Sequence, residues 1–235
     1  MRPGTGARHP AKIPVLIGVE DLHYLDATGL SRHRGIADMM RYAIINQGLN
    51  RIASFGSFQL SSSPIVGRFE DEQLYALALY IYSLKPPANP NTANSQTRLG
   101  ANVFEREGCA VCHPAPLYTN NKLTPAMGFR VPPELRKRDA ILDVSVGTNR
   151  SLATETRRGT GFYKVPSLRY LWLRILYGHE GSAASLEEWF DPSRLRRDYE
   201  PKGYHYDPSP IEGHEFGLRL NSEEKSALIA FLRTL

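Results

Sequence analysis

The order of apolar and polar positions along the chain predicts a mainly helical protein with few strands. Over residues 33–47 the apolar side chains recur at helical spacing on one broad face, and Gly48 ends the helix. That face consists of Ile36, Met39, Met40, Ala43 and Ile44. A second helix is predicted over about residues 70–84, because acidic residues suit its positive N-terminal end and Pro86 and Pro87 stop it.

A proline- and asparagine-rich segment follows and predicts a boundary between two regions. Residues 86–95 contain no apolar side chain larger than alanine, so this segment cannot contribute to a core. We therefore divide the chain into residues 1–88, a partial N-terminal helical region that includes the start of the linker, and residues 89–235, a second domain.

The second region predicts further helices around a long loop. A helix over about residues 96–106 directs Leu99, Val103 and Phe104 inward. Residues 114–164 have little periodicity and are predicted to be a loop that wraps something or is functional. Capping-box patterns at residues 185–188 and 221–224 start two more helices. The apolar side of the closing helix is formed by Leu228, Ile229, Phe231, Leu232 and Leu235.

Charge and composition exclude several classes of protein. The formal net charge is +5, and the short basic clusters Arg136–Arg138 and Arg194–Arg197 are expected to be solvated surface. There is no aromatic–basic motif for nucleic acid and no apolar run of membrane-spanning length. The chain has 2 cysteines, which excludes a framework of several disulfides.

Both cysteines lie in one five-residue motif, Cys109-Ala-Val-Cys112-His113, which is the pattern of covalent haem c attachment. Two thiols three positions apart on a helical turn can form thioethers with the two vinyl groups of a porphyrin. The next residue, His113, then lies beneath the ring and can bind the iron. A zinc site would need a second ligand pair, and a thioredoxin-like dithiol would need a preceding strand; neither pattern is present.

The ligand on the other side of the iron is less well defined. His214 is the first candidate, because flanking glycines at 213 and 217 permit close backbone approach. Met127, on the loop after the motif, is the second. His179, Tyr199 and an open position remain as alternatives. The cofactor-binding residues expected are therefore Cys109, Cys112 and His113, with His113 and His214 binding the metal and no catalytic residue assigned.

The order of motifs resembles the bacterial di-haem cytochrome c peroxidase superfamily over about residues 96–235. The segments that carry the resemblance are Gly108–His113, Tyr163–Arg169, His179–Glu188 and the closing helix. The resemblance implies a mainly α, cytochrome c-like domain whose long loops wrap one covalent haem, preceded by a short helical remnant of another domain. In such proteins one haem reacts with hydrogen peroxide, and the haem of the C-terminal domain relays electrons. This chain looks like the latter domain, with Gly100 and Phe104 facing the closing helix and Lys164–Arg169 near the haem edge.

Two departures from the family pattern shape the functional expectation. Only one C-x-x-C-H motif is present, so the peroxidatic role is not carried over. The family usually supplies a methionine or tyrosine ligand shortly after the Leu-Glu-Glu segment, but residues 189–193 contain neither, which favours His214.

We therefore expect single-electron transfer, with a redox protein as donor or acceptor and a neighbouring haem domain as partners. The alternatives are a peroxidase that acts when a second haem domain is present, with Glu180 or Glu215 as acid–base group, and a sensing module with an open iron position. Haem c attachment implies a periplasmic location. Residues 1–10 show no secretory leader, and we expect the chain to be a fragment.

Overall fold

The computed structural model describes residues 11–48, 70–138, 140–156 and 159–235, with side chains described only to residue 43 in the first range. The predicted lack of a leader at residues 1–10 and the position of the Ile44 side chain lie outside the described residues. The α-helices are α1 (Ile36–Gly48), α2 (Asp71–Ser83), α3 (Ser95–Arg106), α4 (Cys109–Cys112), α5 (Pro133–Arg136), α6 (Ser151–Glu155), α7 (Leu186–Trp189) and α8 (Ser222–Arg233). Three short 3-10 helices cover Val19–Asp21, Leu171–Leu173 and Pro192–Leu195.

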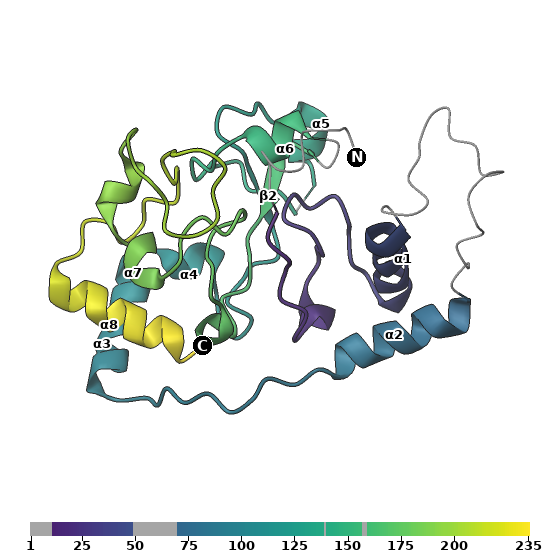
Figure 1. Ribbon diagram of the computed structural model, residues 1–235, viewed down its shortest axis with the longest axis horizontal. Coiled ribbons are helices and arrows are strands. Elements are labelled where there is room, and N and C mark those ends of the chain that lie inside the picture. The colour runs from purple at the N-terminus through teal and green to yellow at the C-terminus, as the bar shows by residue number, and fades with distance from the viewer. Residues whose placement is uncertain (1–10, 49–69, 139, 157–158) are drawn as a thin grey trace.

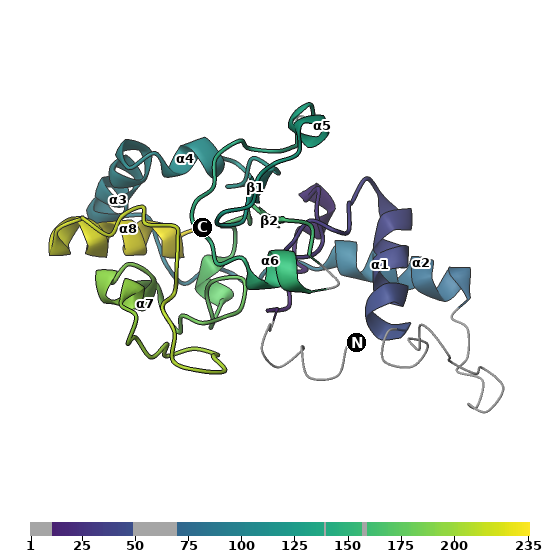
Figure 2. The ribbon, with the colours of Figure 1, turned by 90° about the horizontal axis from the view of Figure 1, so that it is seen from above.

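The longest helices of the C-terminal region, α3 and α8, pack directly against each other (Figures 1 and 2). Both begin with a reciprocal capping box, led by Asn94 and Asn221. A Cβ added to Gly100 would lie only 1.9 Å from the carbonyl oxygen of Ala227, so this glycine sets how closely the helices approach. Phe104 meets Phe231 edge to face, with 5.4 Å between ring centroids. The sequence prediction for this helix pair is confirmed.

Residues from segments far apart in the sequence form the core around this helix pair. Val103, Phe104, Leu228 and Leu232 are buried in it, together with Leu171, Leu186, Phe190 and Ile229. Leu99 was predicted to face inward, but 37% of it is exposed. The reason is that α3 turns its glycine, not its leucine, toward α8.

The N-terminal region has a smaller core of its own. Met39 of α1 and Ala78 of α2 are buried against Leu25 and the 3-10 helix Val19–Asp21. An extended stretch, residues 84–94, leads from α2 along one side of the molecule to α3 (Figure 1). The helices predicted over residues 33–47 and 70–84 are both confirmed, with ends shifted by a few residues.

Residues 114–164, predicted as a loop, contain four short elements. Strands β1 (Leu123–Pro125) and β2 (Phe162–Lys164) pair antiparallel, with Thr124 opposite Tyr163. Helices α5 and α6 lie between them in sequence. The strands are only three residues each and pair across more than thirty intervening residues, so local periodicity could not reveal them.

The N-terminal segment packs onto this strand pair. Tyr24 is buried beside Leu123 and Phe162, and the backbone N–H of Lys164 donates to the carbonyl of Ala27 over 2.9 Å. The parts of the chain on either side of the predicted boundary therefore share an interface.

The predicted capping box at residues 185–188 is only half formed. The Ser185 hydroxyl accepts from the N–H of Glu188 at 3.0 Å, as predicted. The Glu188 carboxylate accepts instead from the N–H groups of Ala184 and Lys202 and from the Tyr199 hydroxyl. The buried Glu188 carboxylate therefore accepts hydrogen bonds from residues outside its helix and does not complete the capping box.

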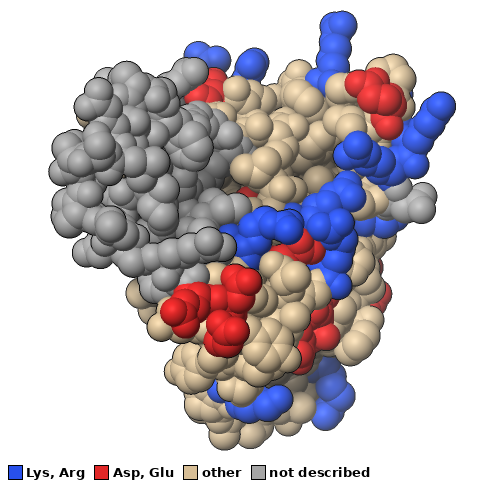
Figure 3. All heavy atoms as spheres, turned by 90° about the vertical axis from the view of Figure 1, so that its right-hand side faces the viewer, with Lys and Arg blue, Asp and Glu red and all other residues tan. Residues whose placement is uncertain are grey.

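The surface is of mixed charge. On the face shown in Figure 3, lysine and arginine side chains lie beside aspartate and glutamate side chains, without one continuous field of a single sign. Among the described helices, none is long and apolar enough to cross a membrane.

Candidate functional site

A cavity of about 650 Å³ lies between the helix pair and the loops of the C-terminal region. Its walls come from α4, from residues 163–171 and 177–182, from residues 205–216, and from the N-terminal segment. Apolar side chains dominate several walls, among them Phe104, Leu168, Leu171, Trp189 and Leu228. A cavity of this size and character suits a largely apolar organic cofactor.

Cys109 and Cys112 stand at the two ends of α4, and both line the cavity. Gly108 adopts a left-handed conformation, φ 75°, which separates α4 from α3 and turns the chain toward the cavity. The two thiols are free. Burial raises the pKa of the Cys109 thiol to about 11, and the nearby Glu107 carboxylate adds to this effect. Protonated thiols of this kind are poor redox nucleophiles, which argues against a thioredoxin-like dithiol.

His113 follows directly and is buried, with 6% of the residue exposed. Its Nδ1 lies 2.9 Å from the carbonyl oxygen of Tyr118, so Nδ1 donates and Nε2 is left with a free lone pair. Burial lowers the pKa of His113 to about 4. The imidazole is therefore neutral at physiological pH, which is the form that binds a metal.

His214 approaches His113 from another wall of the cavity, with 6.4 Å between the ring centroids and 59° between the planes. Its backbone is left-handed, φ 50°, and its N–H donates to the carbonyl of Val146 over 2.6 Å. Its Nδ1 is buried without a hydrogen-bond partner among the described residues. Burial, and then the neighbouring His113, lower the pKa of His214 to about 4.

The separation of these two rings suits a shared metal. A metal–imidazole bond is about 2.0–2.1 Å long and the ring nitrogen lies about 1.1 Å from the centroid, so ligands on opposite sides of one iron have centroids roughly 6.3 Å apart. The ring centroids of His113 and His214 have this separation. The described residues hold no group of three or more His, Cys, Asp or Glu that could bind a metal ion by themselves. Two imidazoles alone suit an iron whose remaining ligands come from a macrocycle.

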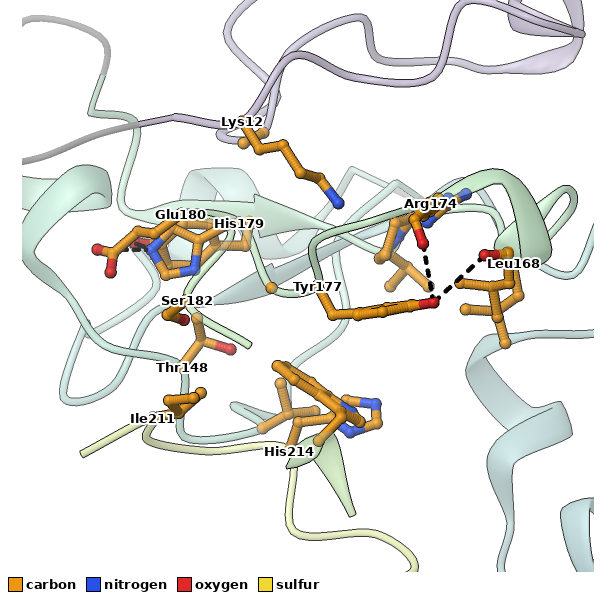
Figure 4. A pocket seen from close by; sticks show the side chains of 18 of the residues that line it. Lys12, Thr148, Leu168, Arg174, Tyr177, His179, Glu180, Ser182, Ile211 and His214 are labelled. Carbon is orange, nitrogen blue, oxygen red and sulfur yellow. Dashed lines mark hydrogen bonds and ion pairs between the residues drawn. The ribbon is translucent and has the colours of Figure 1, made fainter. Parts of the chain in front are cut away.

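The structure separates the other candidate ligands from this pair. Met127 is 40% exposed and does not line the cavity. Tyr199 is also outside the lining, and its hydroxyl donates to Glu188 over 2.7 Å. His179 does line the cavity, but its Nε2 lies 3.1 Å from the Glu180 carboxylate and 3.3 Å from the Tyr163 hydroxyl (Figure 4).

Of the two candidate acid–base groups, Glu180 lines the cavity and Glu215 is exposed at the surface. Of the two, Glu180 is therefore the carboxylate that lies at the cavity.

Arg194 is a site residue that sequence reasoning misplaced. It was predicted to belong to a solvated basic cluster, but it is fully buried, with 0% exposed. Its guanidinium donates to the carbonyls of Trp189, Ile211, Gly213 and His214. It therefore ties the loop that carries His214 to the end of α7, and desolvation lowers its pKa. No local pattern distinguishes it from the exposed Arg196 and Arg197 that follow.

Several lysine and arginine side chains also line the cavity. The family resemblance places the stretch Lys164–Arg169 near the haem edge, whereas nothing in the sequence indicates Lys12 or Arg174. Lys12, Lys164, Arg169 and Arg174 all contribute. Burial lowers the pKa of Lys164 to about 8 and that of Arg174 to about 10. A cavity that combines apolar walls, two thiols, two imidazoles and cationic side chains fits a haem, which has an apolar ring, two vinyl groups, an iron and two carboxylates.

Comparison with known proteins gives similarities in sequence and in structure, and no family model matches the chain. In sequence it is 27% identical over 148 residues to the cytochrome c551 peroxidase of Nitrosomonas europaea, a match that covers 62% of this chain. The matched part is 35% of that peroxidase, so the chain spans about a third of its length. In structure it resembles a MauG-like protein associated with microbial copper homeostasis, with a TM-score of 0.57 and 18% identity, over 99% of this chain and 75% of the other.

The two similarities agree with the family resemblance found from the motifs. The sequence similarity supports a relationship to cytochrome c peroxidase-like haem proteins, and the structural similarity concerns the fold. The mainly helical fold is shared with the MauG-like structure.

Proposed function

We propose that this chain is a c-type haem protein that transfers single electrons, as the electron-relay domain of a di-haem cytochrome c peroxidase-like protein. The observation that carries the proposal is the facing pair His113 and His214, 6.4 Å apart between ring centroids. With the haem bound, His113 and His214 would be the two protein ligands of its iron, and no position would remain open for a substrate. A filled coordination shell favours electron transfer over chemistry at the metal.

The residues that we propose to hold the haem have distinct roles. Cys109 and Cys112 attach the haem through thioethers, and His113 and His214 bind the iron. When bound, the haem supplies an iron that gains and loses one electron. The Tyr118 carbonyl fixes the orientation of the His113 ring, because it accepts the hydrogen bond from Nδ1. The fully buried Arg194 donates to the carbonyls of Gly213 and His214 and so holds the backbone that carries the His214 ring.

The proposal also implies the partners and the location of the protein. The partners are a redox protein that gives or takes the electron and a neighbouring haem domain. The location is periplasmic, because bacteria attach haem c outside the cytoplasm.

A second candidate function is hydrogen peroxide reduction in the presence of a second haem domain. The observation that favours it is Glu180, whose carboxylate lies beside His179 in the wall of the same cavity. Glu180 would supply an acid–base group to a peroxide in this cavity.

The absorption spectrum of the matured protein separates the two functions. Electron transfer predicts low-spin bands in the oxidised and reduced states, unchanged by carbon monoxide or peroxide. His214→Ala should convert the haem to high spin, because one axial ligand is lost. Met127→Leu is the matched control and should leave the spectrum unchanged. Carbon monoxide binding to the unmodified protein would contradict the six-coordinate proposal and favour the peroxidase. A low-spin spectrum of the His214→Ala protein would show that His214 is not a ligand of the iron.

A further inference from the structure

The N-terminal segment forms part of the cavity wall, although it lies far from the haem motif in sequence. Lys12, Pro14, Val15 and Ile17 line the cavity, whereas Ile13 between them is 80% exposed. The segment is fixed at Lys12, whose backbone N–H donates to the carbonyl of His179 over 2.9 Å. The Lys12 ammonium donates to the carbonyl of Leu176 over 2.7 Å. Both contacts join the segment to the loop that forms another wall.

Lys12 and Arg174 bring two partly buried positive charges into one part of the cavity. Figure 4 shows both on the opposite side of the view from His214. The Arg174 guanidinium donates to the carbonyls of Ser167 and Arg169, and its Nε atom is buried without a hydrogen-bond partner among the described residues. Burial and the charge of Arg174 lower the pKa of Lys12 to about 8.

Two of the cations that line the cavity have no carboxylate partner. Within the part of the chain that the structure describes, no ion pair links Lys12 or Arg174 to a carboxylate. Lys164 differs from them, because the charge of Asp26 acts on it and its ammonium donates to the carbonyls of Tyr24 and Leu25. Removing a cation from water without a partner of opposite charge is unfavourable, so the pair Lys12 and Arg174 calls for an anionic ligand.

We infer that Lys12 and Arg174 bind the carboxylate groups of the cofactor, so that the N-terminal segment 12–17 closes the cavity over it. The inference rests on the proposed function, because the haem is the cofactor that brings two carboxylates into an otherwise apolar cavity. Both side chains donate N–H groups, which suit carboxylate oxygens. Their other described partners are carbonyl oxygens, which leaves donors available.

The test compares matched single variants of the full, haem-loaded chain. Lys12→Met and Arg174→Met remove the cations, and Lys12→Arg keeps the first. Lys137→Met and Arg219→Met are the controls, since both residues are exposed and outside the cavity lining. The readouts are haem content, from the absorbance of the reduced pyridine complex, and the reduction potential from a spectroscopic titration. The carboxylate band of carbon-13-labelled haem in the infrared spectrum reports the contact itself.

Removal of either cation should favour the oxidised, more positive haem. At a fixed electrode potential we expect the ratio of reduced to oxidised protein to fall about three- to tenfold, where tenfold corresponds to about 59 mV for one electron. The carboxylate band should shift in both Met variants and stay in place in Lys12→Arg and in the controls.

The outcomes distinguish this inference from the proposed function. Haem-free unmodified protein would overturn the proposed function. Haem-loaded Lys12→Met with the potential and carboxylate band of the controls would overturn the role of the N-terminal segment alone. If Arg174→Met does not fold, Arg174→Gln replaces it, with the same shift expected.

Discussion

The two sides of the cavity are built in different ways. One side is the helix pair α3–α8 with the short α4, where apolar side chains interlock and Gly100 permits close approach. The other side is made of loops from residues 12–17, 163–182 and 205–216, with little regular structure. The helical side carries Cys109, Cys112 and His113, and the loop side carries His214.

Different interactions stabilise the two sides. The helical side depends on burial of apolar surface and on backbone hydrogen bonds between near neighbours in sequence. The loop side depends on long side chains that donate to backbone carbonyls, such as Arg194 across 17 to 20 residues and Lys164 across 139 and 140. We therefore expect the helical side to determine whether the haem is attached and the chain is folded, and the loop side to determine whether His214 is held in place as the second ligand of the iron.

The largest effect should follow from breaking the helical side at its cysteines. In the double variant Cys109→Ala, Cys112→Ala no thioether can form, so covalent haem should be lost completely. The mass of the denatured protein, with and without the haem increment, measures this directly. Ser145→Ala, a change of similar size outside the cavity lining, is the control and should keep the full haem mass. Retention of covalent haem by the double variant would contradict the attachment site.

The next effect should follow from breaking the loop side at Arg194. Arg194→Met keeps the length of the side chain but leaves several buried carbonyls without a donor, and each unsatisfied group costs about 1–3 kcal/mol. We expect a loss of about 3 kcal/mol in the free energy of unfolding, because breaking a buried charged group from its partners typically costs about 3–5 kcal/mol. The visible spectrum should gain high-spin bands as His214 becomes less well held.

Arg197→Met provides the comparison for this variant, since Arg197 is exposed and lies in the same basic cluster. It should change neither stability nor spectrum. A stable, fully low-spin Arg194→Met protein would show that the His214 loop is held by other contacts.

The sequence could predict the helical side because its rules are local. Asn221 and Glu224 indicate the start of α8, and the spacing of its apolar residues predicts its buried face. The C-x-x-C-H motif predicts three site residues within five positions. His214 is predicted from its glycine-rich surroundings, and its ring lies 6.4 Å from that of His113 between centroids.

The loop side could not be predicted in the same way. Arg194 and Arg197 occupy one basic run, yet one is fully buried and the other is exposed, because only the former meets the carbonyls of residues 211–214. Lys12 and Arg174 come together across more than 160 positions, through contacts that no periodicity encodes. Strands β1 and β2 were missed for the same reason. Long-range partners of polar side chains require the structure.

The smallest of these effects, and the sharpest test of the contrast, is Gly100→Ala on the helical side. The new Cβ would lie 1.9 Å from the Ala227 carbonyl oxygen and 2.7 Å from Cβ of Phe231, so the helices must move apart. Overpacking of this kind costs about 1–3 kcal/mol, while alanine gains about 1 kcal/mol of helix propensity over glycine. We expect a net loss of about 1 kcal/mol in the free energy of unfolding of the haem-loaded protein, measured by thermal or denaturant unfolding. Asn102→Ala, on the exposed face of the same helix, should be neutral or slightly stabilising.

The spectrum of Gly100→Ala should stay low-spin, in contrast to Arg194→Met, because His113 and His214 are held by other segments. High-spin bands in Gly100→Ala would show that iron ligation depends on both sides, and the division between them would fail.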